Sequence, residues 1–391
     1  MTTFGQRLSQ FKGFGPGFDF ARIFLAFSVL AWHTGWVATG SEATQQRPVL
    51  WVLFYSILPM FFGLSGFLIA GSAQRLSLKN FLVNRGLRIL PALGVEIILS
   101  AAVLGPLLTV FTLAHYLSDK TLYMYFFNIT GWVHYRLPGV FLNAPVPALV
   151  NGSLWTVPFE MFCYAIMSGL ILSGWIKRGW VMVALAFGVV SIGVVYQMFG
   201  SHMPPNYLKQ MLDMIFDRGA LLIPCFLLGA AAYALRDRIV YDARIFFACV
   251  AAALALGYFG DWHLARYCAL AFFTCPLYMY IMLFVGMSPM PKLPFFSTGD
   301  YSYGVYLYAF PIQQTVVSAL HVTNIAGHLV SSAVAATLFA TFSWHCIEKP
   351  ILAARKNFSF VARKELNREA EPAGSPVTPP APETSAARAE A

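Results

Sequence analysis

Charged residues are scarce in this chain of 391 residues, at 11% against about 25% in a typical soluble domain. Hydrophobic residues make up 58%, and the mean hydropathy is +0.64. This composition excludes a soluble globular protein, and the long apolar runs predict an all-α polytopic membrane protein. A membrane β-barrel would show short segments of alternating hydrophobicity instead.

Cysteines are few, and none forms a C-x-x-C pair, so neither a disulfide framework nor a zinc site is expected. We interpret them as buried thiols inside predicted spans, and we expect no bound metal or cofactor. No basic motif interleaved with aromatic residues is present, so the net charge of +9 indicates topology and anionic lipid rather than nucleic acid. The six cysteines are Cys163, Cys225, Cys249, Cys268, Cys275 and Cys346.

Ten apolar segments are long enough to be membrane-spanning helices. The first is too long for a cleaved signal peptide and contains charged residues, so we expect it to remain as a span. The ten segments are residues 19–38, 49–70, 89–112, 153–174, 179–198, 219–235, 244–260, 263–286, 301–320 and 326–346.

Lysine and arginine set the topology. With ten spans, the main basic clusters all fall on one side, which the positive-inside rule identifies as cytoplasmic, and both termini lie there. We therefore predict a cytoplasmic segment at 1–17, a membrane domain at 18–355 and a tail at 356–391. The tail is rich in Ala, Pro, Glu, Ser and Thr, which predicts disorder.

Residues 113–152 then form a loop on the outer side. Its apolar piece, Thr121–Trp132, is too short to span the bilayer and is expected to lie at the interface or to re-enter. The aromatic residues of this loop would either stack on sugar rings or form an ordinary interfacial belt.

The first helix carries Asp19, Arg22 and His33, which are costly in lipid. At 100° per residue they share one face, and Asp19 and Arg22 can pair at i,i+3. His33 lies roughly 21 Å from Asp19 along the axis, towards the outer half. His33 is either a general base or a hydrogen-bonded core histidine, and the Asp19–Arg22 pair either shapes a channel or anchors the interface.

Two further groups of polar residues occur in predicted spans or at their ends. Arg85 and Arg88, at the entrance of the third helix, either bind phosphate with their planar donor forks or supply positive-inside charge. Glu160, inside the fourth helix, either orients His33 and stabilises its imidazolium form or makes a structural pair. Glu348 is expected to close the bundle electrostatically, whereas Glu96 and Arg266 receive no role.

Aromatic and hydroxyl side chains gather near two helix starts. They line a polar channel or, alternatively, form an aromatic belt. The predicted channel-lining residues are Trp155, Tyr301, Ser302 and Tyr306.

Six motifs in order resemble the membrane-bound acyltransferase 3 family, bacterial O-acyltransferases of polysaccharides and related glycans. The resemblance covers about residues 14–355. A departure is Ala309, where many members have a histidine, which places more weight on His33. The motifs are "FDFARIFLAFSVLAWH", "FFGLSGFLI", the basic motif of Arg85, Arg88 and Pro91, "SLWTVPFEMFCY", "YSYGVYLYAFP" and "EKP".

The resemblance implies a cytoplasmic acyl-CoA donor, commonly acetyl-CoA, and a glycan hydroxyl or lipid-linked glycan as acceptor, in a bacterial cytoplasmic membrane. Arg85 and Arg88 would hold the donor phosphates, with Asp19 and Arg22 shaping the entrance. His33 would be the base and Glu160 its partner. A secondary transporter of a small or lipid-linked glycan is the alternative, and it predicts broken helices in matched halves. The acyl group and the acceptor remain open.

Overall fold

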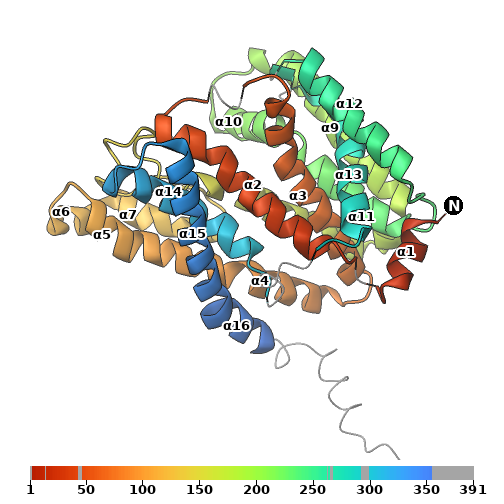
Figure 1. The fold of residues 1–391 in the computed structure, drawn as a ribbon, viewed down its shortest axis with the longest axis horizontal. Coiled ribbons are helices and arrows are strands. Elements are labelled where there is room, and N and C mark those ends of the chain that lie inside the picture. Colours follow the sequence, from red (N-terminus) through yellow and green to blue (C-terminus); the bar gives the residue numbers. More distant parts are fainter. Residues whose placement is uncertain are drawn as a thin grey trace, which may run out of the picture.

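The computed structural model describes residues 2–13, 15–42, 46–261, 263–264, 267–291 and 299–354. Helices joined by loops make up this part of the chain, and no strand occurs within it (Figure 1). The predicted all-α class is confirmed. Arg266 and the predicted tail at 356–391 lie outside the described residues.

The bounds of the helices follow chain order. The first half contains α1 (Phe4–Gln10), α2 (Phe18–Thr39), α3 (Leu50–Ala73), α4 (Leu78–Leu99), the π-helix η1 (Ser100–Leu104), α5 (Gly105–Leu108), α6 (Leu113–Ser118), α7 (Lys120–Tyr125), η2 (Phe126–Thr130), η3 (Gly152–Thr156) and α8 (Val157–Leu172). The second half contains η4 (Trp175–Lys177), α9 (Gly179–Phe199), η5 (Gly200–His202), α10 (Tyr207–Asp213), the π-helix η6 (Met214–Arg218), α11 (Leu222–Ala234), α12 (Ala243–Phe259), η8 (Cys268–Leu270), α13 (Ala271–Met287), α14 (Ser302–Ala319), α15 (Ile325–Ser343), the π-helix η10 (Trp344–Glu348) and α16 (Lys349–Ala354).

Each of the ten predicted segments falls on a helix. Seven helices of the described chain are long and apolar enough to cross a membrane, and an eighth span results if α10–η6 and α11, which are bent by 51°, count as one. Of the remaining two, α12 has 17 residues and α14 has 18 residues with several polar side chains. The chain is thus an integral membrane protein by its helices, and the number of ten spans stays a prediction.

The third span begins earlier than predicted. Ser77 caps α4 by accepting a hydrogen bond from the Asn80 backbone N–H (3.4 Å), and the helix continues through η1 and α5 to Leu108. The polar residues after Ser77 pointed to a loop up to residue 88, but they are helical. Arg85 and Arg88 therefore lie within α4, about two to three turns from its start, rather than at its entrance.

Glycines bring α3 and α11 into backbone contact. A Cβ atom on Gly66 would lie 2.0 Å from the Phe226 carbonyl oxygen, and one on Gly229 would lie 2.0 Å from that of Gly63. Such close approach is typical of packed membrane helices, which gain from dispersion contacts rather than from hydrophobic burial. On the other side of α3, helix α2 runs through the middle of the bundle and packs against α14 and α15 (Figure 1).

Both ends of the described chain lie at one end of the bundle. The Phe4 backbone N–H donates to the Ile239 carbonyl after α11 (2.9 Å), and the Arg7 side chain donates to the Met287 carbonyl at the end of α13 (3.2 Å). The start of α2 and the end of η10 meet there too, through side chains described below. This placement fits an even number of crossings between the ends.

The cysteines are only partly as predicted. Four are buried, but Cys249 is half-buried and Cys346 is exposed. Cys346 lies in η10, and neighbouring Glu348 is the buried residue of that turn, so the thiol faces away from the bundle. The interpretation of every cysteine as a buried thiol was wrong for these two.

Candidate active site

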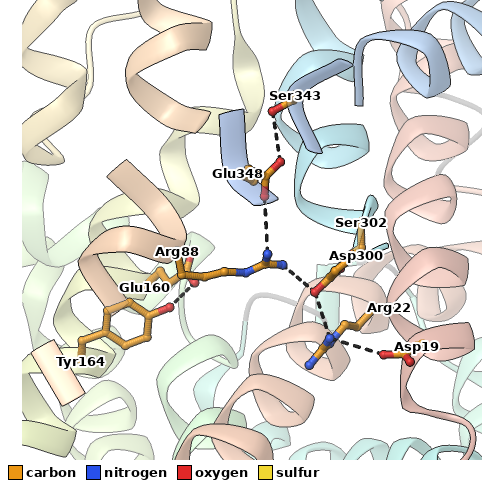
Figure 2. Close-up of polar contacts among 9 residues, drawn as sticks. All are labelled: Asp19, Arg22, Arg88, Glu160, Tyr164, Asp300, Ser302, Ser343 and Glu348. Atoms are coloured by element: carbon orange, nitrogen blue, oxygen red, sulfur yellow. Dashed lines mark hydrogen bonds and ion pairs between the residues drawn. The ribbon is translucent and has the colours of Figure 1, made fainter. Parts of the chain in front are cut away.

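Asp300, just before α14, is the centre of a chain of ion pairs at one end of the bundle (Figure 2). Its Oδ2 atom lies 2.9 Å from Arg22 Nη1 and 2.6 Å from Arg88 Nη2. Arg22 also lies 3.6 Å from Asp19, which confirms the predicted i,i+3 pair, but the Asp19 side chain is 91% exposed. Asp300 therefore joins α2 to α4, whereas water screens the contribution of Asp19.

Arg88 makes a second ion pair with η10. Its Nη1 atom lies 3.4 Å from Glu348 Oε2, and Ser343 Oγ donates a hydrogen bond to the other Glu348 oxygen (3.0 Å). Ser302 Oγ donates to Asp300 Oδ1 (2.6 Å). The network thus ties α2, α4, α14 and the end of α15 together, and Glu348 closes the bundle as predicted.

The charge state of Asp300 follows from its neighbours. Burial raises the pKa of this carboxyl, but the positive charges of Arg88 and Arg22 lower it by more. Hydrogen bonds from Ser302 act in the same direction as the arginines. The pKa lies well below its ordinary value, so Asp300 is ionised at neutral pH and offsets charge on both guanidinium groups.

A cavity of about 150 Å³ lies beside this network, and we call it the arginine cavity. Arg22, Arg85 and Arg88 all line it, together with two carboxylates, Asp300 and Glu160. Most of the remaining lining is apolar or aromatic. It includes Leu58, Phe61, Ile89, Cys163, Tyr164, Ser302, Tyr303 and Tyr306.

Arg85 differs from the other two arginines of this cavity. Its Nε atom is buried without a hydrogen-bond partner in the described part of the chain, where no ion pair of Arg85 is found either. Glu160 acts on it only through longer-range attraction. A buried donor without a partner is costly, so this side chain is suited to an acceptor oxygen supplied by a ligand.

Glu160 does not lie with His33. It accepts a hydrogen bond from the Tyr164 hydroxyl one turn further along α8 (2.5 Å) and lines the arginine cavity, whereas His33 lines a different cavity. The predicted contact between Glu160 and His33 is therefore not found. Trp155, which does line the cavity of His33, belongs to η3 and stands five residues before Glu160.

The second cavity, of about 420 Å³, is the histidine cavity. The His33 ring packs edge-on against Phe310, with 5.1 Å between centroids, and is stacked with Trp32 at 5.7 Å. His33 Nδ1 is buried and has no hydrogen-bond partner within the described chain. Five aromatic and two acidic side chains contribute to the lining. The lining comprises Trp32, His33, Trp36, Glu42, Tyr55, Leu58, Pro59, Tyr135, Leu149, Gly152, Trp155, Asp217, Ala220, Leu221 and Leu222.

The two cavities share one lining residue. Leu58 lines both, and the consecutive residues Trp155 and Thr156 line the histidine and the arginine cavity respectively. Thr156 Oγ1 lies 2.6 Å from the Tyr306 hydroxyl, which also donates to the Ser153 carbonyl (3.1 Å). The hydrogen-bonded side chains of Thr156 and Tyr306 thus lie on the arginine cavity next to Trp155 of the histidine cavity.

The predicted channel-lining residues separate into three places. Ser302 and Tyr306 line the arginine cavity, and Trp155 lines the histidine cavity. Tyr301 is buried elsewhere, with its hydroxyl 3.0 Å from His345 Nε2 and its ring against Trp344.

Sequence reasoning missed three acidic residues of the site. Asp300 stands one residue before the tyrosines that were selected, and the signal was the need of two intramembrane arginines for an anion. Asp217 and Glu42 line the histidine cavity, and no sequence signal singles them out. Among the described residues, no group of three or more His, Cys, Asp or Glu is placed to hold a metal ion.

The chain is similar to known acyltransferases. Residues 16–345 match the acyltransferase 3 family model, described as an acyltransferase domain. An O-acetyl transferase of Shigella phage Sf6 is 30% identical over 351 residues, which cover 86% of this chain and 95% of that protein. Nodulation protein 10 of Rhizobium leguminosarum bv. viciae is 28% identical over 381 residues, which cover 90% of this chain and 97% of that protein. No solved structure gives a significant match.

Proposed function

The chain belongs to the acyltransferase 3 family, and on that premise we propose that it transfers an acetyl group from cytoplasmic acetyl-CoA to a hydroxyl of a glycan. The protein lies in a bacterial cytoplasmic membrane, with the arginine cavity facing the cytoplasm and the histidine cavity facing outwards. The observation that carries the proposal is that an arginine-lined cavity and a histidine-lined cavity share a wall at Leu58.

The arginine cavity receives the donor. Pockets that hold a whole ligand of drug size have volumes of about 300–1,000 Å³, so a cavity of about 150 Å³ admits only the thioester end of the pantetheine arm. The phosphates stay at the mouth. Arg85, which has no ion-pair partner in the described segments, is the first candidate to bind them. Arg22 and Arg88 are already paired with Asp300, so their guanidinium groups mainly fix the shape of the entrance. Asp19, through its pair with Arg22, adds negative charge at the edge of the entrance.

His33 acts as the general base. It accepts the proton of the acceptor hydroxyl while that oxygen attacks the thioester carbonyl carbon. The new C–O bond forms, the C–S bond breaks, and the proton returns from the imidazolium to the CoA thiolate. Glu160 lies with the arginines and balances their charge instead of orienting His33.

The histidine cavity receives the acceptor. Its tryptophans and tyrosines offer flat apolar faces on which the C–H faces of a sugar ring can stack, with Trp155, Trp36 and Tyr135 as examples. The acetyl group is also supported by the relative described as an O-acetyl transferase. The acceptor reaches the cavity as a free or lipid-linked glycan.

The test uses membrane vesicles containing the protein and acetyl-CoA labelled in the acetyl group. His33→Ala is expected to abolish labelling of glycan while the protein remains folded and inserted. Near-normal transfer by this variant would remove His33 as the base. Uptake of the label or of a glycan into the vesicles without acyl transfer would favour a carrier instead. A deletion strain gives a second test: if its surface glycans keep the mass of the acyl group but a transported glycan is lost, the protein is a carrier.

A further inference from the structure

The loop before η3 supplies part of the wall of the histidine cavity. Leu149 and Gly152 both line it, and we call residues 146–152 the wall segment. Gly152 lies so close to Phe310 that a Cβ atom would be 2.6 Å from its ring, and Phe310 packs against His33. The position of this segment therefore affects both the cavity and the ring of the proposed base.

The wall segment has little regular structure of its own. Residues 146–151 lie between η2 and η3, outside any helix, and Gly152 begins η3. Ala148 has a φ of 57°, and Phe141, seven residues earlier, has a φ of 55°. Such positive φ values strain residues other than glycine and persist only where surrounding contacts hold them. Something outside the segment must hold it in place.

Gln314 of α14 is the first anchor. Its fully buried amide donates two hydrogen bonds from Nε2, to the carbonyl oxygens of Val146 (2.8 Å) and Leu149 (2.7 Å). Both carbonyls belong to the wall segment, and an irregular loop would otherwise leave them without partners. One side chain of α14 thus fixes both ends of a four-residue stretch.

Asn151 is the second anchor, and it gives a place to Glu96. The fully buried Asn151 amide donates to Glu96 Oε1 in α4 (2.9 Å) and to the Leu307 carbonyl in α14 (3.0 Å). The same Glu96 oxygen accepts from Ser100 Oγ (2.9 Å). The wall segment is therefore attached to two different membrane helices at buried points.

Building on the proposed function, we propose that Gln314, Asn151 and Glu96 are positioning residues that fix the wall segment and thereby set binding of the sugar acceptor. They touch neither the donor nor the reacting atoms. Their loss widens and loosens the histidine cavity while the arginine cavity keeps its ion pairs. The effect falls on the acceptor alone.

Hydrogen exchange tests the anchors without any assumption about catalysis. In Gln314→Ala, loss of both hydrogen bonds should speed exchange of amides in residues 141–152 by about tenfold or more. The matched control is Gln74→Ala, which removes one amide bond to a backbone carbonyl, that of Ile176 (3.1 Å), away from both cavities. Equal exchange in Gln314→Ala and the wild type would overturn the anchoring role.

Kinetics and binding then test the consequence for the acceptor. Binding is followed by tryptophan fluorescence with oligosaccharides of glucose, rhamnose or N-acetylglucosamine, which requires no acyl transfer. Gln314→Ala and Glu96→Leu should weaken sugar binding and raise the acceptor KM about tenfold, while the KM for acetyl-CoA stays unchanged. In Glu96→Gln, which keeps the accepting oxygen, sugar binding and the acceptor KM should stay near the wild-type values. Equal changes in both KM values, or a fall in kcat alone, would refute the positioning role. Sugar binding without transfer would instead count against the proposed function and leave the anchors standing.

Discussion

Replacing Asp300 by asparagine removes the one carboxylate that two arginines share. Loss of one partner of a buried ion pair costs about 3–5 kcal/mol. The side chains of Asp300, Arg22 and Arg88 are 22%, 27% and 22% exposed, so water recovers part of that energy. Asparagine also keeps one hydrogen-bond acceptor, and we expect a net loss of about 2 kcal/mol.

The assay is thermal denaturation of the detergent-solubilised protein, in which this loss should lower the midpoint by about 3 °C. The matched control is Asp19→Asn. Asp19 also pairs with Arg22, at 3.6 Å, but its side chain is 91% exposed, so this substitution should leave the midpoint unchanged. The substitution of Asp300 also removes one counter-charge from each of Arg88 and Arg22, which makes both guanidinium groups more attractive to phosphate, so the KM for acetyl-CoA should stay the same or fall. Unchanged thermal stability, or a raised KM with stability intact, would refute the reasoning.

Three further outcomes are expected. Arg85→Ala should raise the KM for acetyl-CoA about tenfold or more without changing the denaturation midpoint, because Arg85 has no partner to lose among the residues that the structure describes. A midpoint that falls with an unchanged KM would make Arg85 a structural charge. Because the folded-state pKa of Asp300 lies below its unfolded value, its contribution to stability is present above pH of about 4 and is lost as the pH falls further, so the gap in midpoint between the wild type and Asp300→Asn should close below pH 4. Gly66→Ala should destabilise the protein strongly, because its Cβ would lie 2.0 Å from the Phe226 carbonyl oxygen. Gly169→Ala, where a Cβ meets nothing within 4 Å, should be neutral or stabilising. Similar expression levels and denaturation midpoints for the two variants would contradict the packing of α3 on α11.

The helices were predictable because a span needs about 20 apolar residues, and that signal is local. The Asp19–Arg22 pair was predictable for the same reason, since residues three apart on a helix face each other. The start of α4 was not, because Lys79 and Asn80 look like loop residues until the Ser77 cap is seen.

Contacts between distant segments were beyond the sequence. Asp300 is 278 residues from Arg22, and a single sequence without an alignment does not predict that the two side chains meet. The depth and rotation of α8 are set by packing against its neighbours, so the assignment of Glu160 to His33 rested on residue type alone. The structure gives Glu160 the arginines as neighbours instead.

The shared wall at Leu58 has an electrical consequence. In the proposed reaction both cavities open to water, so the transmembrane voltage would fall mainly across the wall that they share. A unit charge crossing it would feel about 2.3 kcal/mol per 100 mV. An acetyl group carries no charge, so its passage from thioester to sugar costs the cell no work against the membrane potential.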